Sequence, residues 1–339
     1  MSEVRRIAVL GGGSWGVALA RLLSRKGHPT RVWEFNPEAA DVLIQDRQLK
    51  FKLPGVLLDE SVGISSDLAV SVAGTEVVVL AVPAGFMRST CRSLRGCLPE
   101  SALLVSAAKG LEKGTRKRMS QVAGEELGEE ALDRWAVLSG PSHAEEVGRD
   151  VPTTVVSAAF RPEVARAVQR VFMTPSLRVY TSDDVLGAEI GGAIKNVIAI
   201  AAGISDGLGF GDNTKAALVT RGLAEIMRLG TAMGARPETF AGLSGLGDLV
   251  VTCCSVHSRN YRLGRLLAEG KSLPAALDFI GMVVEGVSTA ESIAGLSRDY
   301  GVEMPISTEI ASVLFDGKPP RRAVSDLMMR EAKPERERT

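Results

Sequence analysis

The chain has 339 residues, which is enough for two domains of about 150 residues each. Hydrophobic residues make up 45% of it and charged residues 24%, as in an ordinary soluble globular protein. Lysine plus arginine equals aspartate plus glutamate at 40 each, so no overall charge favours nucleic acid or an anionic membrane, and any anion-binding site must be local.

Neither targeting nor metal-binding signals are evident. The N-terminus lacks the apolar core of a signal peptide, and no uninterrupted apolar run reaches the ~18 residues that a membrane span needs. The cysteines have no metal-type spacing; they are Cys91, Cys97, Cys253 and Cys254. The histidines are scattered as well, at His28, His143 and His257. We therefore expect a reduced, metal-free, cytoplasmic protein without a nucleic-acid partner or membrane insertion.

The N-terminus predicts a dinucleotide-binding turn. A short apolar run, Arg6 to Leu10, ends in a G-x-G-x-x-G pattern at Gly11, Gly13 and Gly16, and a helical pattern follows. These glycines permit a tight turn, close approach of a pyrophosphate and close packing of helix on strand. The helix N-terminus then offers free N–H groups to phosphates. Strand, turn and helix in this order predict a Rossmann-type fold.

A second strand, Pro29 to Trp33, leads into Glu34. An acidic residue at this place usually binds the ribose hydroxyls of NAD, and it would repel the additional phosphate of NADP. Glu34 therefore favours NAD. The alternative is a solvated glutamate at a strand end that contacts nothing.

The rest of the first half alternates strands with helices. Further strands are expected at Glu76 to Val82, Ala102 to Ser106, Thr153 to Ser157 and Arg178 to Thr181, with a crossover helix at Met87 to Leu98. This alternation predicts a parallel, doubly wound sheet. The charged segment Glu112 to Arg134 indicates a solvated helix.

Loops at the carboxyl ends of such strands line the ligand crevice. They are expected at residues 82–84, 108–110 and 139–142. Lys109 follows its strand directly and could reach a ligand anion, although an ordinary surface lysine is an equal alternative.

From Asp183 onward helical patterns replace strand patterns, so we place the domain boundary near Ser182. The sequence predicts a dinucleotide-binding domain at residues 1–182, an all-α domain at 183–333 and a charged, frayed tail at 334–339. Helices are expected at residues 216–233, 274–280, 289–300 and 306–315.

The segment Leu186 to Asn213 is the most unusual part of the chain. Its first half is apolar on every side apart from Glu189, Lys195 and Asn196. A helix without a polar face is normally buried, and a buried lysine is normally paired or functional. Desolvation would lower its pKa, which suits a residue that gives and takes a proton. The alternative is a lysine whose charge reaches water from a partly exposed helix.

Two further loops carry polar groups. Leu243 to Leu249 is rich in glycine and holds one carboxylate, Asp248. Farther along, Ser258, Arg259 and Asn260 open another helix, and an arginine with polar groups at a helix N-terminus can bind phosphate. The alternative is a turn with a solvated aspartate and a helix-capping serine.

Five segments together resemble the bacterial NAD(P)-dependent glycerol-3-phosphate dehydrogenase family. They are Ser139–Ser142, Gly192–Asn196 with the glycines and Asn213 that follow, Gly245–Leu249, Ser258–Asn260 and Val284–Gly286. The resemblance extends from Arg6 to Lys333. It implies a Rossmann-type doubly wound α/β domain followed by an all-α domain, as the patterns also predict. It further implies a homodimer that converts dihydroxyacetone phosphate to sn-glycerol 3-phosphate for phospholipid synthesis.

The same resemblance assigns roles to individual residues. Lys195 is the general acid/base. The substrate-binding residues are Lys109, Gly140, Ser142, Asp248, Thr252, Ser258, Arg259 and Asn260. The cofactor-binding residues are Gly11, Gly13, Ser14, Trp15, Gly16, Glu34, Phe35, Lys109, Ala144, Arg259, Val283 and Glu285. Phe35 stands where many members of the family carry a basic residue, which also favours NAD.

Two other functions are compatible with this plan. A β-hydroxyacid dehydrogenase has two similar domains and a lysine on the corresponding helix, but its substrate carries a carboxylate beside the reacting carbon. The loop with Asp248 and the Ser258–Asn260 segment argue against it. A cofactor-sensing protein without chemistry would have no need for Lys195, Lys109 and Asp248 together.

Overall fold

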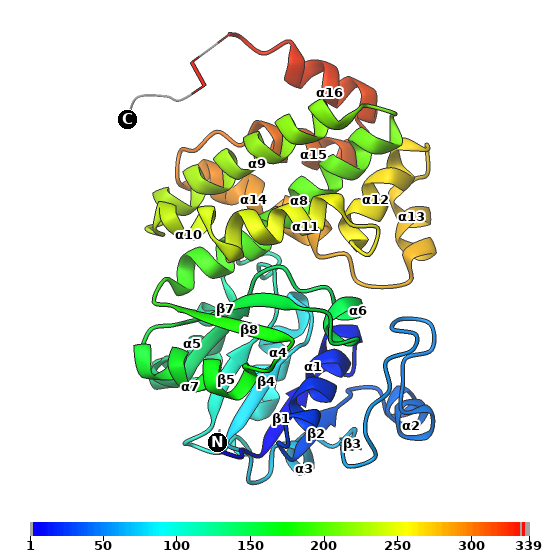
Figure 1. Cartoon of the computed structure of the whole chain (residues 1–339). Coiled ribbons are helices and arrows are strands. Elements are labelled where there is room, and N and C mark those ends of the chain that lie inside the picture. Colours follow the sequence, from blue (N-terminus) through cyan, green and yellow to red (C-terminus); the bar gives the residue numbers. More distant parts are fainter. Residues whose placement is uncertain (1–2, 333, 336–339) are drawn as a thin grey trace.

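The computed structural model describes residues 3–332, 334 and 335, so most of the predicted tail at 334–339 lies outside the described residues. Figure 1 shows an α/β part in the lower half of the view, where helices flank a sheet, and an all-helical part in the upper half. The first strand, β1, lies in the lower part of the view and the last helix, α16, lies at the top.

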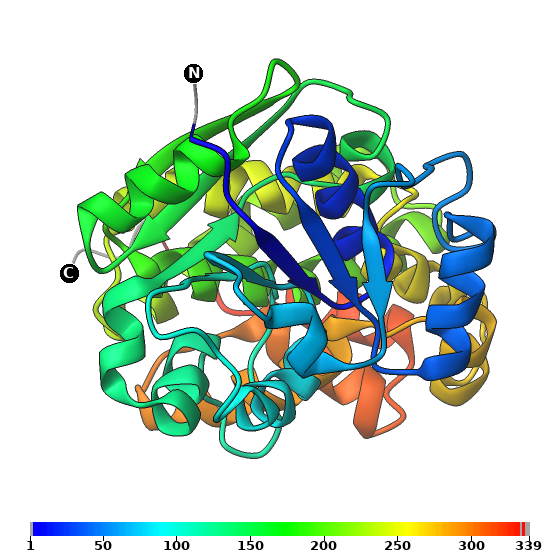
Figure 2. The same ribbon diagram turned by 90° about the horizontal axis from the view of Figure 1, so that it is seen from below.

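Within the described residues, one sheet has eight strands in the order β3-β2-β1-β4-β5-β6-β7-β8. Figure 1 shows the sheet in the lower half of the molecule, and Figure 2 shows the molecule from below. The strands are β1 (Ile7–Leu10), β2 (Thr30–Trp33), β3 (Gly63–Ser65), β4 (Val77–Leu80), β5 (Leu103–Ser106), β6 (Trp135–Ser139), β7 (Thr153–Ala159) and β8 (Leu177–Ser182). The predicted doubly wound sheet is confirmed. The short edge strand β3 was not predicted, since no apolar run marks it, and β6 was implied only by the strand-end loop expected at 139–142.

One pair of strands departs from the expected parallel arrangement, because β6 and β7 are antiparallel. The segment between them contains only the short helix α6 (Ala144–Val147). An antiparallel pair needs no crossover that carries the chain back along the whole sheet, so α6 and the loops beside it are enough to join β6 to β7. Strand β7 therefore starts near the end of β6 and runs beside it in the opposite direction.

Helices cover both faces of the sheet. They are α1 (Ser14–Arg25), α2 (Pro37–Asp46), α3 (Leu68–Val72), η1 (Ala84–Phe86), α4 (Met87–Leu94), α5 (Met119–Leu127), η2 (Glu129–Arg134), α6 and α7 (Pro162–Phe172). In β4, Val77 and Val79 belong to the core under α1 and α7, whereas Val78 and Leu80 belong to the core under α4 and α5. This alternation explains why the central strands are continuous apolar runs.

The expected solvated helix at Glu112 to Arg134 is wrong. The segment contains a loop followed by α5 and η2, and α5 buries Met119, Val122 and Ala123 against the sheet. Gly114, Arg116 and Gly128 have φ values of 83°, 62° and 92°, and these left-handed conformations break a continuous helix.

The second domain is helical, as predicted. Its elements are α8 (Val185–Gly207), α9 (Asp212–Ala232), α10 (Pro237–Ala241), the π-helical turn η3 (Leu243–Gly247), α11 (Asp248–Cys254), α12 (Arg259–Ala268), α13 (Leu273–Ile280), α14 (Glu285–Asp299), α15 (Pro305–Phe315) and α16 (Pro320–Met328). The glycine-rich loop expected at Leu243 to Leu249 is therefore helical. Its glycines serve close packing, since a Cβ on Gly245 would lie 2.1 Å from the carbonyl oxygen of Phe240.

Helix α8 is the central element of this domain, with α9, α11, α12 and α14 packed around it (Figure 1). It is long and apolar enough to cross a membrane, yet 94% of its apolar window is buried inside the protein. Close approach to α12 requires glycine, because a Cβ on Gly203 would lie 2.0 Å from the carbonyl oxygen of Tyr261. The helix is thus buried on all sides, as its lack of a polar face predicts.

Candidate active site between the two domains

The glycine turn lies between β1 and α1. Gly11 has a φ of 119°, and a Cβ there would lie 2.9 Å from the carbonyl oxygen of Ala81. A Cβ on Gly16 would lie 1.9 Å from the carbonyl oxygen of Gly11, so this glycine lets the helix close on the turn. A Cβ on Gly13 would meet nothing within 4 Å. The backbone at the N-terminus of α1 is therefore open to an anionic ligand such as a pyrophosphate.

Glu34 lies against this turn. Its Oε2 accepts a hydrogen bond from the backbone N–H of Gly12 at 3.1 Å, and its Oε1 accepts one from Asn36 at 3.1 Å. The alternative of a solvated glutamate without contacts is therefore wrong. Phe35 is 78% exposed and its ring meets Trp33 edge-on, with 6.1 Å between the ring centroids.

The next two predicted residues also lie at the turn. The Ser14 hydroxyl donates to the carbonyl oxygen of Lys52 at 3.0 Å. Trp15 packs against the apolar core on the α1 face of the sheet.

Two lysines share one buried carboxylate at the junction of the domains. Lys195 Nζ, from α8, donates to Asp248 Oδ1 at 2.7 Å and to the Thr252 hydroxyl at 2.7 Å. Lys109 Nζ, from the loop after β5, donates to the other oxygen, Asp248 Oδ2, at 2.8 Å. The side chains of Lys195 and Asp248 are only 7% and 1% exposed. The buried interpretation of Lys195 holds, and its charge does not reach water.

Burial and the mutual attraction of the charges together set the pKa values of this cluster. Burial lowers the pKa of Lys195 to about 8, an effect that Asp248 opposes and the charge of Lys109 reinforces. Burial by itself would raise the pKa of Asp248, but the two lysines outweigh it and leave that pKa below its ordinary value. Asp248 therefore stays ionised at neutral pH, while Lys195 can exchange its proton there.

Lys109 is held by the loop after β6 as well. Its ammonium donates to the carbonyl oxygen of Gly140 at 2.7 Å and to the Ser142 hydroxyl at 3.0 Å. Gly140 has a φ of 125°, and a Cβ there would lie 3.1 Å from the Cα of Val155. Glycine is therefore needed for this carbonyl to face the lysine.

The turn η3 places Asp248 on α8. A Cβ on Gly191 would lie 2.6 Å from the carbonyl oxygen of Ser244, so only glycine lets the turn seat directly on the helix. Asp248 begins α11 immediately after this turn, and Thr252 follows one helical turn later. The Thr252 hydroxyl also donates to the carbonyl oxygen of Asp248 at 2.6 Å, which fixes its orientation toward Lys195.

The N-terminus of α12 presents the predicted phosphate-binding residues. The Ser258 hydroxyl caps this helix by accepting from the N–H of Tyr261 at 3.2 Å. The exposed Arg259 donates to the carbonyl oxygen of Val283 at 2.7 Å. The helix end, its capping serine and the arginine lie together, as an anion site requires.

Asn260 is buried within a chain of amides. Its Nδ2 donates to Asn196 Oδ1 at 2.9 Å, and its Oδ1 accepts from the N–H of Gly286 at 2.9 Å. Asn196 Nδ2 in turn donates to the carbonyl oxygen of Lys109 at 3.2 Å. No role was predicted for Asn196, although a polar residue beside Lys195 in an apolar helix was a usable signal.

The remaining cofactor candidates lie around the same junction. Glu285, at the start of α14, accepts from the N–H of Ala84 at 3.0 Å and so joins the helical domain to the loop after β4. Burial raises the pKa of Glu285, while the Ala84 N–H and the charge of Arg259 oppose that rise. Val283 is 46% exposed, and Ala144 is buried at the start of α6.

A surface groove of about 910 Å³ lies beside the junction but not over the lysines. Its lining comes from the outer side of η3 and α11 and includes Leu243, Val250 and His257. The ring of His257 lies 5.9 Å, between centroids, from that of His143. Among the described residues, no three or more His, Cys, Asp and Glu side chains are grouped so as to hold a metal.

Comparison with known proteins identifies the family. Residues 6–165 match the model of the NAD-dependent glycerol-3-phosphate dehydrogenase N-terminus, and residues 184–325 match that of its C-terminus. The chain is 55% identical over 324 residues to a glycerol-3-phosphate dehydrogenase [NAD(P)+] of Moorella thermoacetica, a match that covers 96% of each chain. It is 50% identical over 328 residues to that of Fusobacterium nucleatum, covering 97% of this chain and 98% of that protein.

A solved structure supports the same family assignment. The crystal structure of glycerol-3-phosphate dehydrogenase from Coxiella burnetii is 36% identical and superposes with a TM-score of 0.92, covering 96% of this chain and 99% of that one. The glycine turn, the Lys195–Asp248–Lys109 cluster and these matches agree across both domains. The chain belongs to the NAD-dependent glycerol-3-phosphate dehydrogenase family of oxidoreductases.

Proposed function

We propose that this protein catalyses reversible hydride transfer between NAD(P)H and dihydroxyacetone phosphate to give sn-glycerol 3-phosphate, with Lys195 as general acid/base. The observation that carries the proposal is the buried Lys195 ammonium, hydrogen-bonded to Asp248 and Thr252. A lysine with a pKa of about 8 can both give and accept a proton near neutral pH. Family membership supports the choice of substrate.

The residues of the N-terminal domain fit a dinucleotide. The open backbone at Gly13 and the N-terminus of α1 suit the pyrophosphate, and Glu34 suits ribose hydroxyls. When bound, the nicotinamide supplies or accepts the hydride. The other proposed contacts are Gly11, Ser14, Trp15, Gly16 and Phe35 on the sheet side, and Lys109, Ala144, Arg259, Val283 and Glu285 around the junction.

Lys195 would act on the oxygen of the substrate carbonyl. As that oxygen becomes negative, the Lys195 ammonium stabilises the charge and donates its proton, so the carbonyl becomes an alcohol. Asp248 holds the ammonium in place and opposes its early deprotonation. In the oxidation direction, neutral Lys195 takes the proton from the alcohol.

The substrate phosphate would be held at the start of α12. Arg259, the capping Ser258 and the free N–H groups of the helix end supply a cation and donors in one place. Asn260, Thr252, Gly140 and Ser142 complete the proposed substrate contacts, and Lys109 is positioned by Asp248 beside the reacting end.

We propose NAD as the preferred cofactor. The Glu34 carboxylate lies at the glycine turn, where the negative charge would repel the additional phosphate of NADP. Phe35, exposed beside it, provides no cation for that phosphate.

The first experiment follows the loss of NADH and NADPH absorbance in parallel with dihydroxyacetone phosphate as substrate. We expect turnover with NADH to exceed that with NADPH. Equal or faster turnover with NADPH would contradict the role given to Glu34 while leaving the reaction intact. Turnover only with a β-hydroxyacid would support the alternative dehydrogenase, and stoichiometric cofactor binding without turnover would support a sensor.

Lys195→Ala tests the acid/base role. Turnover should fall by about 10²–10⁴-fold, because general acid–base catalysis contributes that much. Cofactor affinity, measured by NADH fluorescence, should stay near that of the wild type because the glycine turn is unchanged. Near-normal turnover would refute the role.

We also propose a cytoplasmic homodimer whose product supplies phospholipid synthesis. Light scattering of the purified protein tests the oligomeric state, and a monomer at micromolar concentration would contradict it.

A further inference from the structure

The segment Lys109–Ser120 follows β5, runs along the helical domain and ends in the first turn of α5. We name this segment the strap. Its Leu111 is 1% exposed and packs in the core of the helical domain, although the strap belongs to the other domain by sequence. Two ion pairs tie it to α14, Lys113–Glu291 at 3.2 Å and Arg116–Asp299 at 3.0 Å. The strap is thus fixed to both domains.

The end of the strap is clamped on the helix that carries Lys195. Glu189 of α8 accepts hydrogen bonds from the Ser120 N–H, the Ser120 hydroxyl and Arg118 Nη1, each at 2.7 Å. The side chains of Glu189 and Arg118 are 3% and 14% exposed. A carboxylate so deeply buried is stable only when it is paired and fully hydrogen-bonded, so these contacts are mutually dependent. We name Arg118, Ser120 and Glu189 the clamp.

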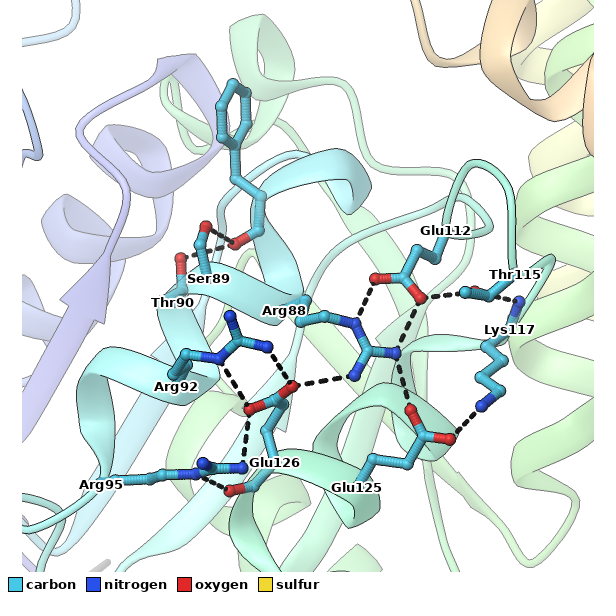
Figure 3. Close-up of polar contacts among 11 residues, drawn as sticks. Arg88, Ser89, Thr90, Arg92, Arg95, Glu112, Thr115, Lys117, Glu125 and Glu126 are labelled. Carbon is cyan, nitrogen blue, oxygen red and sulfur yellow. Dashed lines mark hydrogen bonds and ion pairs between the residues drawn. The ribbon is translucent and has the colours of Figure 1, made fainter.

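The middle of the strap is also held by a network of ion pairs with α4 and α5 of the N-terminal domain (Figure 3). Arg88 of α4 donates to both oxygens of Glu112, at 2.7 and 2.8 Å. The same guanidinium reaches Glu125 and Glu126 of α5, at 2.7 and 2.9 Å. Further members of the network are Arg92, Arg95, Thr115 and Lys117. A bidentate arginine–carboxylate pair fixes orientation as well as distance, so the strap has little freedom here.

We propose that Glu189 is a positioning residue for the reaction: through the clamp it fixes the strap on α8 and keeps the Lys109 ammonium on Asp248. The inference rests on the proposed roles of Lys195, Asp248 and Lys109. Lys109 has a long side chain whose reach depends on where its backbone is held. The strap is held at its Lys109 end by Asn196, which donates to the carbonyl oxygen of Lys109, and at its Ser120 end by the clamp.

Removal of the clamp should have a measurable electrostatic consequence. The charged and titratable groups that act on or beside Lys195 are Asp248, Lys109, Cys253 and His143. Lys109 is the cation among them that lowers the pKa of Lys195. If Lys109 withdraws, Lys195 holds its proton more tightly and its pKa rises.

The test is Glu189→Gln in the full-length protein, followed by the pH profile of kcat for dihydroxyacetone phosphate reduction. Glutamine keeps the size of the side chain but leaves Arg118 without its counter-charge. We expect kcat to fall by about 10- to 100-fold, as displacement of a catalytic group by about an ångström does. We also expect the midpoint of the profile to move to higher pH, which loss of stability alone would not produce.

Glu225→Gln is the matched control. Glu225 is also a buried carboxylate of the helical domain, and it accepts from the N–H groups of Ile306 and Ser307 and from the Ser307 hydroxyl. It touches neither the strap nor the lysines. We expect this variant to lose thermal stability while it keeps the kcat and the pH midpoint of the wild type.

Two further variants distinguish misfolding of Glu189→Gln from failure of the inference, and failure of the inference from failure of the proposed function. Ser120→Ala removes one clamp hydrogen bond without unpairing a charge, and it should give a smaller shift in the same direction if Glu189→Gln does not fold. Glu189→Gln on a Lys109→Ala background should cause no additional loss of kcat. An unchanged pH midpoint in folded Glu189→Gln, or full additivity with Lys109→Ala, would overturn the inference. A Lys109→Ala variant with normal kcat would instead show that the proposed function is wrong at Lys109.

Discussion

At the scale of single residues, the chemistry of the site follows from burial. Lys195 lies in a helix that is buried on all sides, and the desolvation that this imposes lowers its pKa to about 8. Asp248 keeps the ammonium hydrogen-bonded, so the lysine is neither expelled nor permanently neutral. An exposed lysine would have the same reactive group but would stay protonated throughout the physiological range.

The pH dependence of the two directions should therefore be opposite. Reduction needs protonated Lys195, so its kcat should fall as pH rises through about 8. Oxidation of sn-glycerol 3-phosphate needs neutral Lys195, so its kcat should rise over the same interval. Steady-state rates between pH 6 and pH 10 check this, with thermal unfolding at each pH as the control for stability. Parallel profiles in both directions would contradict the assignment.

At the scale of elements, glycines let helices and turns approach closely enough to build the site. The π-helical turn η3 seats on α8 at Gly191, and α12 approaches α8 at Gly203. In both places a Cβ would collide with a backbone oxygen, which cannot rotate away as a side chain can. Asp248 and the start of α12 are thereby brought to Lys195 by packing, without a long connecting loop.

Gly191→Ala should separate Asp248 from Lys195. The new methyl group would lie 2.6 Å from the carbonyl oxygen of Ser244, so η3 must move. We expect kcat to fall by about tenfold or more and the free energy of unfolding to fall by about 1–3 kcal/mol, typical of overpacking. Steady-state kinetics and urea unfolding measure both quantities.

Gly222→Ala is the control for that substitution. Its methyl group would meet the side chain of Ile198 on α8, at 2.5 Å, away from η3. It should lower stability without lowering kcat. Equal losses of kcat in both variants would contradict the role given to Gly191.

At the scale of the whole molecule, the two domains share side chains across their junction. Leu111 is contributed by the N-terminal domain but is buried in the helical core, and Glu285 is contributed by the helical domain but caps the loop after β4. The candidate site lies at this junction, where each domain contributes a side chain that contacts the other domain. The two domains should therefore unfold together in a single transition.

Leu111→Ala tests this coupling. The substitution should lower the free energy of unfolding by about 2–5 kcal/mol, the usual cost of a large-to-small change in a core. It should also lower kcat, because Lys109 lies two residues earlier on the strap. Calorimetry should still show one transition.

Leu94→Ala, an equally buried position within the N-terminal core, serves as the comparison. It should lower stability by a similar amount and leave kcat unchanged. Two separate transitions in the wild type, or equal losses of kcat in both variants, would show that the domains are not coupled through the strap.

The sequence by itself determined the features that depend on local pattern. The glycine turn, the doubly wound sheet, the helical second domain and the burial of Lys195 all follow from apolar periodicity and from the conformations that glycine permits. Arg259 and Ser258 were recognisable because a helix start with a capping serine is a local signal. Several residues of the candidate site were therefore recognisable before its geometry was known, and the chemical roles given to them are proposals.

Only the tertiary structure decided the features that depend on what packs against a segment. The charged stretch at Glu112 to Arg134 suggested a solvated helix, but distant partners such as Arg88 and Glu189 hold part of it in an ordered strap. The glycines at Leu243 to Leu249 suggested a loop, but they allow a helix to pack tightly on α8. The antiparallel direction of β7 beside β6 became evident only from the pairing of the two strands. Charge and glycine content describe a residue's own preferences, whereas burial and pairing depend on neighbours remote in the chain.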